Sequence, residues 1–88
     1  MRIESVRTTT QFDKHYRTLA ATIKESAKEK ERVFRSNPHD SRLRTHKLHG
    51  KEKGVWAFWI NQKYRIKFIF LDEHSVLFLD VGTHDMYQ

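Results

Sequence analysis

The sequence contains no cysteine, a single proline and only three glycines among its 88 residues. The lack of cysteine excludes a disulfide-stabilised scaffold, a thiolate zinc site and a cysteine nucleophile. The low proline and glycine content argues against a collagenous repeat, a flexible linker or extended disorder. No apolar run approaches the roughly 18 residues that span a membrane, and the N-terminus lacks the apolar stretch of a signal peptide. We therefore expect a soluble cytoplasmic protein with no membrane partner.

Residues 1–88 are enough for one domain and too few for two, because single hydrophobic cores typically occupy about 50 to 200 residues. A core of this size without disulfides gives marginal stability, which suits a protein that works with a partner. The chain is therefore predicted to form a single domain.

Positive charge is concentrated in one part of the chain. The net charge is +6, yet residues 42–67 carry eight basic groups and one acid, whereas residues 68–88 carry four acids and no Lys or Arg. A basic segment within a folded region attracts polyanions. Solvated lysines on exposed strands would give the same composition, so charge alone leaves both interpretations open.

The hydrophobic pattern predicts an α+β fold. Residues 1–7 alternate weakly as a strand, and the threonines at 8–10 are candidate N-caps for the helical pattern that follows. That pattern ends before Asn37-Pro38 and is predicted to be a helical hairpin that breaks near residues 19–22, with a loop at 39–42. Strand-like runs then cover residues 44–48, 55–60, 64–71 and 75–81. We expect a short N-terminal strand, a helical hairpin and an antiparallel β-meander.

Alternation along residues 55–71 predicts which sheet face is buried. Outside residues 61–63, the even positions are fully apolar except for Tyr64, whereas the charged residues are at odd positions. A three-residue turn at 61–63 would pair Phe58 with Ile66 and Trp56 with Phe68, which keeps one apolar face on both strands. A two-residue turn at 73–74 would extend the apolar pairing to the last strand, where it predicts Phe70–Leu77, Phe68–Leu79 and Ile66–Val81.

The same register predicts a polar patch on the opposite face, which the helices would leave uncovered. It pairs Lys67 with Asp80 and Arg65 with Gly82, and one further step brings His84 across from Lys63. Arginine offers a planar fork for phosphate oxygens, and histidine transfers protons near neutral pH. RNA supplies its own nucleophile, the 2′-OH, so such a patch can cleave a phosphodiester without a metal or a covalent enzyme intermediate. An exposed sheet face kept soluble by its charges is the alternative.

Several motifs together resemble toxins of the RelE/ParE superfamily. They read FDK at 12–14, HKLHG at 46–50, KGVW at 53–56, YRI at 64–66 and FLDVGTHD at 78–85, so the resemblance spans nearly the whole chain. It is closest to the YafQ-like and RelE/StbE-like mRNA interferases. The resemblance implies a type II toxin that enters the ribosomal A site and cuts mRNA without metal, leaving a 2′,3′-cyclic phosphate. It also implies an acidic antitoxin that neutralises the toxin. The toxin would bind operator DNA only indirectly, through this antitoxin.

The resemblance also implies roles for individual residues. His84 matches the catalytic histidine that acts as general acid, Arg65 matches the arginine that stabilises the scissile phosphate, and His46 falls where relatives carry a residue that acts on the 2′-OH. Tyr87 lies where an aromatic residue stacks on a base. Two positions depart from the YafQ-like pattern: Trp59 replaces a histidine and Lys63 replaces an aspartate. We expect the remaining RNA contacts from Lys47, His49, Lys51, Lys53, Lys63, Lys67 and Trp59.

Two other functions remain open from the sequence. A ParE-like inhibitor of gyrase would share the fold, although that branch generally lacks the terminal histidine pattern seen at Gly82-Thr83-His84. The second alternative function is that of a basic RNA-binding module without catalytic activity. Of the remaining histidines, His39 is expected to face RNA or solvent, and His15 and His74 to lie at the surface. No two histidines form a compact metal-ligand pair on a predicted helix, so neither a metal nor another cofactor is predicted.

Overall fold

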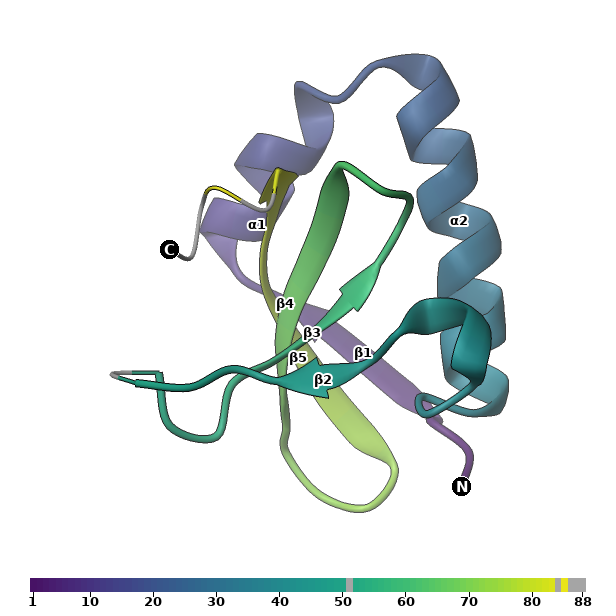
Figure 1. Cartoon of the computed structure of the whole chain (residues 1–88), viewed down its shortest axis with the longest axis vertical. Helices are drawn as coiled ribbons and strands as arrows, with labels where there is room; N and C mark the ends of the chain where they lie inside the picture. Colours follow the sequence, from purple (N-terminus) through teal and green to yellow (C-terminus); the bar gives the residue numbers. More distant parts are fainter. Residues whose placement is uncertain (51, 84, 86–88) are drawn as a thin grey trace.

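The computed structural model describes residues 1–50, 52–83 and 85, and within them it has the predicted α+β architecture (Figure 1). A five-stranded sheet has the order β1-β5-β4-β3-β2. Only β1 runs parallel to its neighbour, β5, and the other neighbours are antiparallel. The elements are β1 (Ser5–Thr8), α1 (Thr10–Arg17), α2 (Ala21–Ser36), the 3₁₀ helix η1 (Ser41–Leu43), β2 (His46–Lys47), β3 (Trp56–Trp59), β4 (Tyr64–Phe70) and β5 (Ser75–Thr83).

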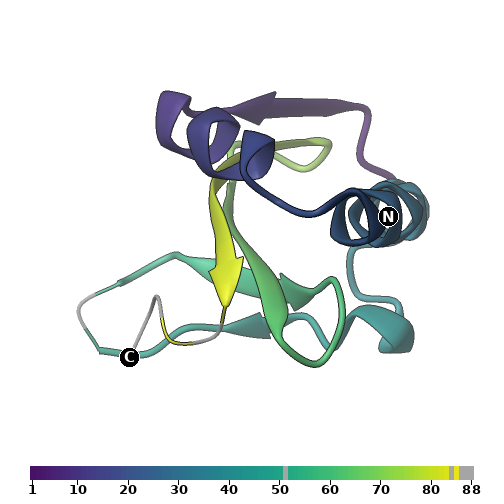
Figure 2. The ribbon, with the colours of Figure 1, turned by 90° about the horizontal axis from the view of Figure 1, so that it is seen from above.

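The helical hairpin begins and ends where local chemistry predicts. Thr9 caps α1, because its hydroxyl accepts a hydrogen bond from the Phe12 amide at 2.9 Å. The chain breaks between Arg17 and Ala21, and α2 ends at Ser36, just before Asn37 and the buried Pro38. Figure 2 shows the molecule from above: α2 lies on one side, and the described part of the connection between β2 and β3 projects away from α2.

Two local predictions were wrong between α2 and the meander. The predicted loop at 39–42 runs into η1, which begins after Asp40 because the Asp40 carboxylate accepts from the Arg42 amide at 2.9 Å. Leu43 in η1 is fully buried and anchors this turn. The strand predicted over residues 44–48 is reduced to His46–Lys47, since only these two residues pair with β3.

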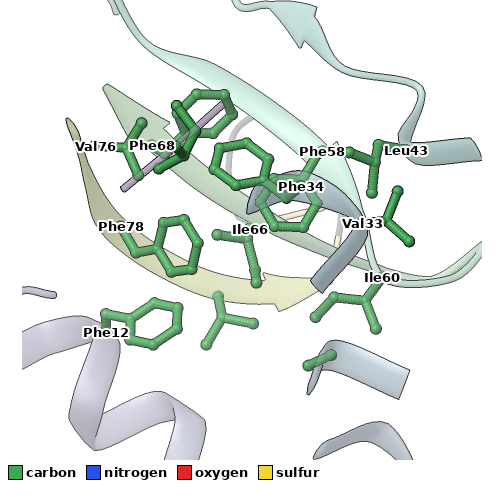
Figure 3. Packing of buried hydrophobic residues seen from close by; sticks show 13 residues of the cluster. Phe12, Val33, Phe34, Leu43, Phe58, Ile60, Ile66, Phe68, Val76 and Phe78 are labelled. Carbon is green, nitrogen blue, oxygen red and sulfur yellow. The ribbon is translucent and has the colours of Figure 1, made fainter. Parts of the chain in front are cut away.

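Phe34 of α2 lies at the centre of the core (Figure 3). Its ring is 4.6 Å from that of Phe58, 4.9 Å from that of Phe68 and 5.7 Å from that of Phe78, measured between centroids. Phe12 of α1 reaches the same cluster through Phe78, at 5.4 Å. The predicted even face of β3 and β4 therefore packs against the helices, and the burial of this apolar surface stabilises the fold.

The predicted register is confirmed between β3 and β4. Trp56 pairs with Phe68 and Phe58 with Ile66. The amide of Ile60 donates to the Tyr64 carbonyl at 2.9 Å, which closes the predicted turn at 61–63.

The register between β4 and β5 was predicted correctly at only one end. Far from the turn, Ile66 pairs with Val81 as expected, but Phe68 pairs with Phe78 and not Leu79, and Phe70 pairs with Val76 and not Leu77. The turn is one residue longer than predicted, because the Leu71 amide already donates to the Ser75 carbonyl. A bulge at the step between Lys67 and Phe68 shifts the pairing by one residue, so that the pairs from Tyr64 to Lys67 have the predicted register. Val76 and Phe78 are consequently buried, whereas Leu77 and Leu79 are only half-buried.

Candidate RNA-cleaving site

The candidate site lies on the face of β3 and β4 opposite the core. The pairings place Arg65 between Trp59 and Gly82, and Lys67 between Ala57 and Asp80, as the sequence predicts. His46, on β2, pairs with Ala57 of β3, so its side chain lies on the same face as those of Arg65 and Lys67. The hairpin β3–β4 and the start of β2 thus position the candidate residues, while α2 packs against the other face.

The Arg65 side chain is buried on this face and is fixed by hydrogen bonds and by an aromatic ring. Its Nη1 donates to the carbonyl oxygens of Asn61 at 2.7 Å and Tyr64 at 3.2 Å, and its Cζ lies 3.9 Å from the centroid of the Trp59 ring. The turn itself is fixed by the Asn61 side chain, whose Oδ1 accepts from the amides of Lys63 and Tyr64. The guanidinium therefore has its position set by turn chemistry before any ligand arrives.

The charge of Arg65 has no counter-ion in the part of the chain that the structure describes. The residue is only 7% exposed, yet none of the ion pairs includes it. Buried charges in proteins are usually paired, because desolvation of an unpaired ion is costly. Neutral carbonyls and the indole ring offset only part of this cost. An anion is the partner that this arrangement lacks.

His46 is exposed on the same face, in a defined tautomer. Its Nδ1 lies 2.9 Å from the carbonyl oxygen of Arg44. A carbonyl only accepts, so Nδ1 carries the proton and donates, and Nε2 of the neutral ring keeps its lone pair. That nitrogen is available to accept a proton from a hydroxyl group.

The predicted patch is more enclosed than expected. Lys67 shares the face of Arg65, but its side chain is only 13% exposed and its ammonium forms an ion pair with Glu52 from the connection between β2 and β3. Gly50 and Gly54, with φ of 84° and 75°, allow the backbone turns on either side of Glu52. Lys63 is exposed at the tip of the β3–β4 turn.

Asp80 does not remain in the patch, which corrects the prediction. Its carboxylate accepts from His15 at 2.6 Å and Gln11 at 2.7 Å, both on α1, and from the Val81 amide at 2.8 Å. The backbone pairing of Asp80 with Lys67 is retained, but the Asp80 carboxylate is bound by the two α1 side chains. Burial alone would raise the pKa of the Asp80 carboxyl, but these hydrogen bonds, that from His15 foremost, hold the pKa below its usual range.

The link between α1 and β5 was missed from the sequence. His15 was predicted only as a surface residue, whereas it is half-exposed and bound to Asp80. The available signal was the spacing of Gln11 and His15, which places both on one face of α1. His74 is exposed as predicted, and its Nδ1 donates to the Arg2 carbonyl at 2.9 Å.

Three predicted site residues, His84, Tyr87 and Lys51, lie outside the described residues. Strand β5 is described up to Thr83, which pairs with Tyr64. Among the residues predicted to contact RNA, Lys47 lies on the other face of the sheet, because it pairs with Trp56 and its Nζ is 6.0 Å from that ring. His49 and Lys53 are exposed.

His39 is exposed, and its ring packs against two aromatic residues at the edge of the core. Its ring lies 5.7 Å from that of Trp56 and 6.1 Å from that of Phe70, between centroids. Within the described part of the chain, no three His, Asp or Glu residues gather in a way that could hold a metal ion. No helix there is both long enough and apolar enough to span a bilayer.

Solved structures share this architecture over almost the whole chain. The YoeB/ParE toxin from Agrobacterium tumefaciens aligns with a TM-score of 0.78 at 15% identity, covering 92% of this chain and 99% of that one. The chain has the RelE-like toxin fold. YafQ in the DinJ–YafQ complex from E. coli aligns at 0.72 with 16% identity, covering 98% and 97%. The archaeal RelE–RelB complex from Pyrococcus horikoshii OT3 aligns at 0.71 with 14% identity, covering 94% and 96%.

The resemblance to the RelE/ParE superfamily, with similarity to YafQ, is thus confirmed at the level of the fold. No protein-family model matches the sequence, and no curated protein matches it. At identities of 14–16%, the RelE-like toxin fold is what the comparison establishes for this chain.

Proposed function

We propose that this protein is the toxin of a type II toxin–antitoxin system and acts as a metal-independent endoribonuclease on mRNA in the ribosomal A site. The observation that carries the proposal is the buried Arg65 guanidinium, which lacks a counter-ion among the described residues and lies on the same sheet face as the exposed His46. A phosphate group supplies the missing negative charge, and the imidazole supplies the base.

The chemistry divides among three groups. Nε2 of His46 takes the proton from the 2′-OH, and the 2′-oxygen attacks the adjacent phosphorus. Arg65 stabilises the negative charge that develops on the phosphate oxygens. The bond to the 5′-oxygen breaks, and His84, by the family resemblance, donates a proton to that oxygen. The products are a 2′,3′-cyclic phosphate and a free 5′-OH.

The surrounding residues would hold the RNA strand. Lys63, exposed at the tip of the β3–β4 turn, would contact a neighbouring phosphate, and the positive charge of Lys67 would add to the attraction of this face for RNA. Trp59 would act by orienting Arg65, whereas the sequence predicts for it a direct contact with RNA. Tyr87 is the residue that we assign to stacking on a base.

An acidic antitoxin is the proposed partner in the cytoplasm. The net charge of +6 favours a negatively charged binding segment, which would associate in a salt-sensitive manner. YafQ and RelE were each solved in complex with a second protein, DinJ and RelB respectively. We expect operator DNA to be bound only through the antitoxin. Co-purification with a co-expressed acidic neighbour-encoded protein tests this partnership.

Induced expression followed by primer extension on cellular mRNA tests the activity. We expect growth arrest with new, specific 5′ ends, and loss of both in His46→Ala and His84→Ala. The matched control is Lys14→Ala, at an exposed position of α1, and we expect this variant to arrest growth as the parent protein does. DNA damage without new 5′ ends would instead identify a ParE-like gyrase inhibitor, and RNA binding without cleavage a non-catalytic module.

A further inference from the structure

Arg44 adjoins the candidate site but lies outside the motifs that carry the family resemblance. It is exposed and has a φ of 50°, in the left-handed region that is uncommon for any residue but glycine. This conformation turns the chain from η1 into β2. It also aims the Arg44 carbonyl at Nδ1 of His46.

The Arg44 side chain brings a second cation to the Trp59 ring. Its Cζ lies 4.7 Å from the ring centroid, compared with 3.9 Å for Arg65. Trp59 stands on β3, between β4, which carries Arg65, and the segment that leads from Arg44 into β2. The ring therefore holds two guanidinium groups beside one sheet face.

Neither guanidinium forms an ion pair with an acid in the described ranges 1–50, 52–83 and 85. The face of the indole attracts both cations, but it leaves their net charge uncompensated. Two planar forks without acidic partners are well suited to phosphate oxygens. Arg44 is exposed where Arg65 is buried, so it can meet a polyanion that approaches the site.

We propose that Arg44 binds a second phosphate of the same RNA strand, next to the phosphate held by Arg65. The proposal rests on the proposed function only in taking single-stranded RNA as the ligand. It assigns a binding role to a residue that the motifs do not include, and it makes Trp59 the common support of two phosphate-binding arginines.

The first test is an NMR titration of the folded protein with a short single-stranded RNA whose 2′-hydroxyls are methylated and which cannot be cleaved. We expect the Nε–Hε signals of Arg44 and Arg65 to shift together, whereas Arg17, exposed at the end of α1, serves as the reference that does not move. An Arg44 signal that does not respond would overturn the proposal.

Affinity measured against salt concentration gives the second readout. Arg44→Gly keeps the left-handed turn, and with it the position of His46, while it removes the guanidinium. We expect roughly tenfold weaker binding and a salt slope reduced by about 0.7, the change for one phosphate of a single strand. Arg44→Lys should retain the slope, and Arg17→Ala should retain both quantities. An unchanged slope in Arg44→Gly contradicts the proposal.

The two hypotheses fail in distinguishable ways. If Arg44 responds to RNA but mRNA on ribosomes stays intact, the proposed function is wrong and the Arg44 site stands. If mRNA is cleaved while Arg44→Gly binds RNA with the parental affinity and slope, the Arg44 site is wrong and the function stands.

Discussion

Replacement of Arg65 by methionine separates a functional arginine from a structural one. The substitution removes two hydrogen bonds from the charged Nη1 to carbonyls, together about 3 kcal/mol at about 1.5 each, and a cation–π contact of about 1 kcal/mol. It also removes the desolvation penalty of a buried, unpaired guanidinium, which amounts to several kcal/mol. The Tyr64 carbonyl keeps its bonds from the amides of Ile60 and Asn61.

These opposing contributions nearly cancel, so we expect Arg65→Met to change the free energy of unfolding by no more than about 1.5 kcal/mol. Urea unfolding followed by circular dichroism measures this, with Phe34→Ala as the reference core variant, for which we expect a loss of about 3 to 5 kcal/mol. Cleavage, in contrast, should fall by at least about 100-fold, as expected when a group that stabilises transition-state charge is lost. A loss of stability close to that of Phe34→Ala, or cleavage that persists, would contradict a functional role for Arg65.

Two further predictions concern the carboxylates of Asp80, which is bound to α1, and Glu52, which is paired with Lys67. Asp80→Asn should lower the free energy of unfolding by about 1 kcal/mol at neutral pH, because it weakens the bonds to α1. Folding lowers the pKa of the Asp80 carboxyl. The carboxylate therefore stabilises the fold fully above the unfolded pKa of about 3.9, and this stabilisation disappears as the pH falls through the pKa of the folded state. Urea titrations at neutral and strongly acidic pH check this, and an equal loss at both would contradict it. Glu52→Gln removes a negative charge beside the candidate site and should tighten RNA binding severalfold at low salt, an effect that fades at high salt. Fluorescence anisotropy with labelled RNA measures it, and an affinity equal to that of the parent at low salt would contradict it.

Much of the fold follows from local rules that the sequence displays. The threonine cap, the helix end before Asn37-Pro38 and the apolar even positions each reflect a constraint confined to a few residues. The bulge in β5 does not, because Phe78 and Leu79 are both apolar and either satisfies the alternation. Packing of Phe78 against Phe12 and Phe34 makes the choice, and that contact joins distant parts of the chain.

The candidate site was predictable in register but not in its contacts. Alternation placed Arg65 and Lys67 on one face correctly, because it depends only on strand pairing. The sequence gives no sign that Glu52 reaches Lys67, since that ion pair depends on how the connection between β2 and β3 folds back. The contact of Arg44 with Trp59 depends on a left-handed backbone at an arginine, which residue preferences disfavour.

We propose that Arg65 and His46 together hold and cleave one ribose–phosphate linkage. The most direct measurement is cleavage of mRNA on purified, programmed ribosomes, with the 3′ ends of the fragments analysed for a 2′,3′-cyclic phosphate. We expect such ends with the parent protein, and none above background with Arg65→Met or His46→Ala. Intact mRNA with the parent protein, or cyclic-phosphate ends produced equally by the two variants, would contradict it.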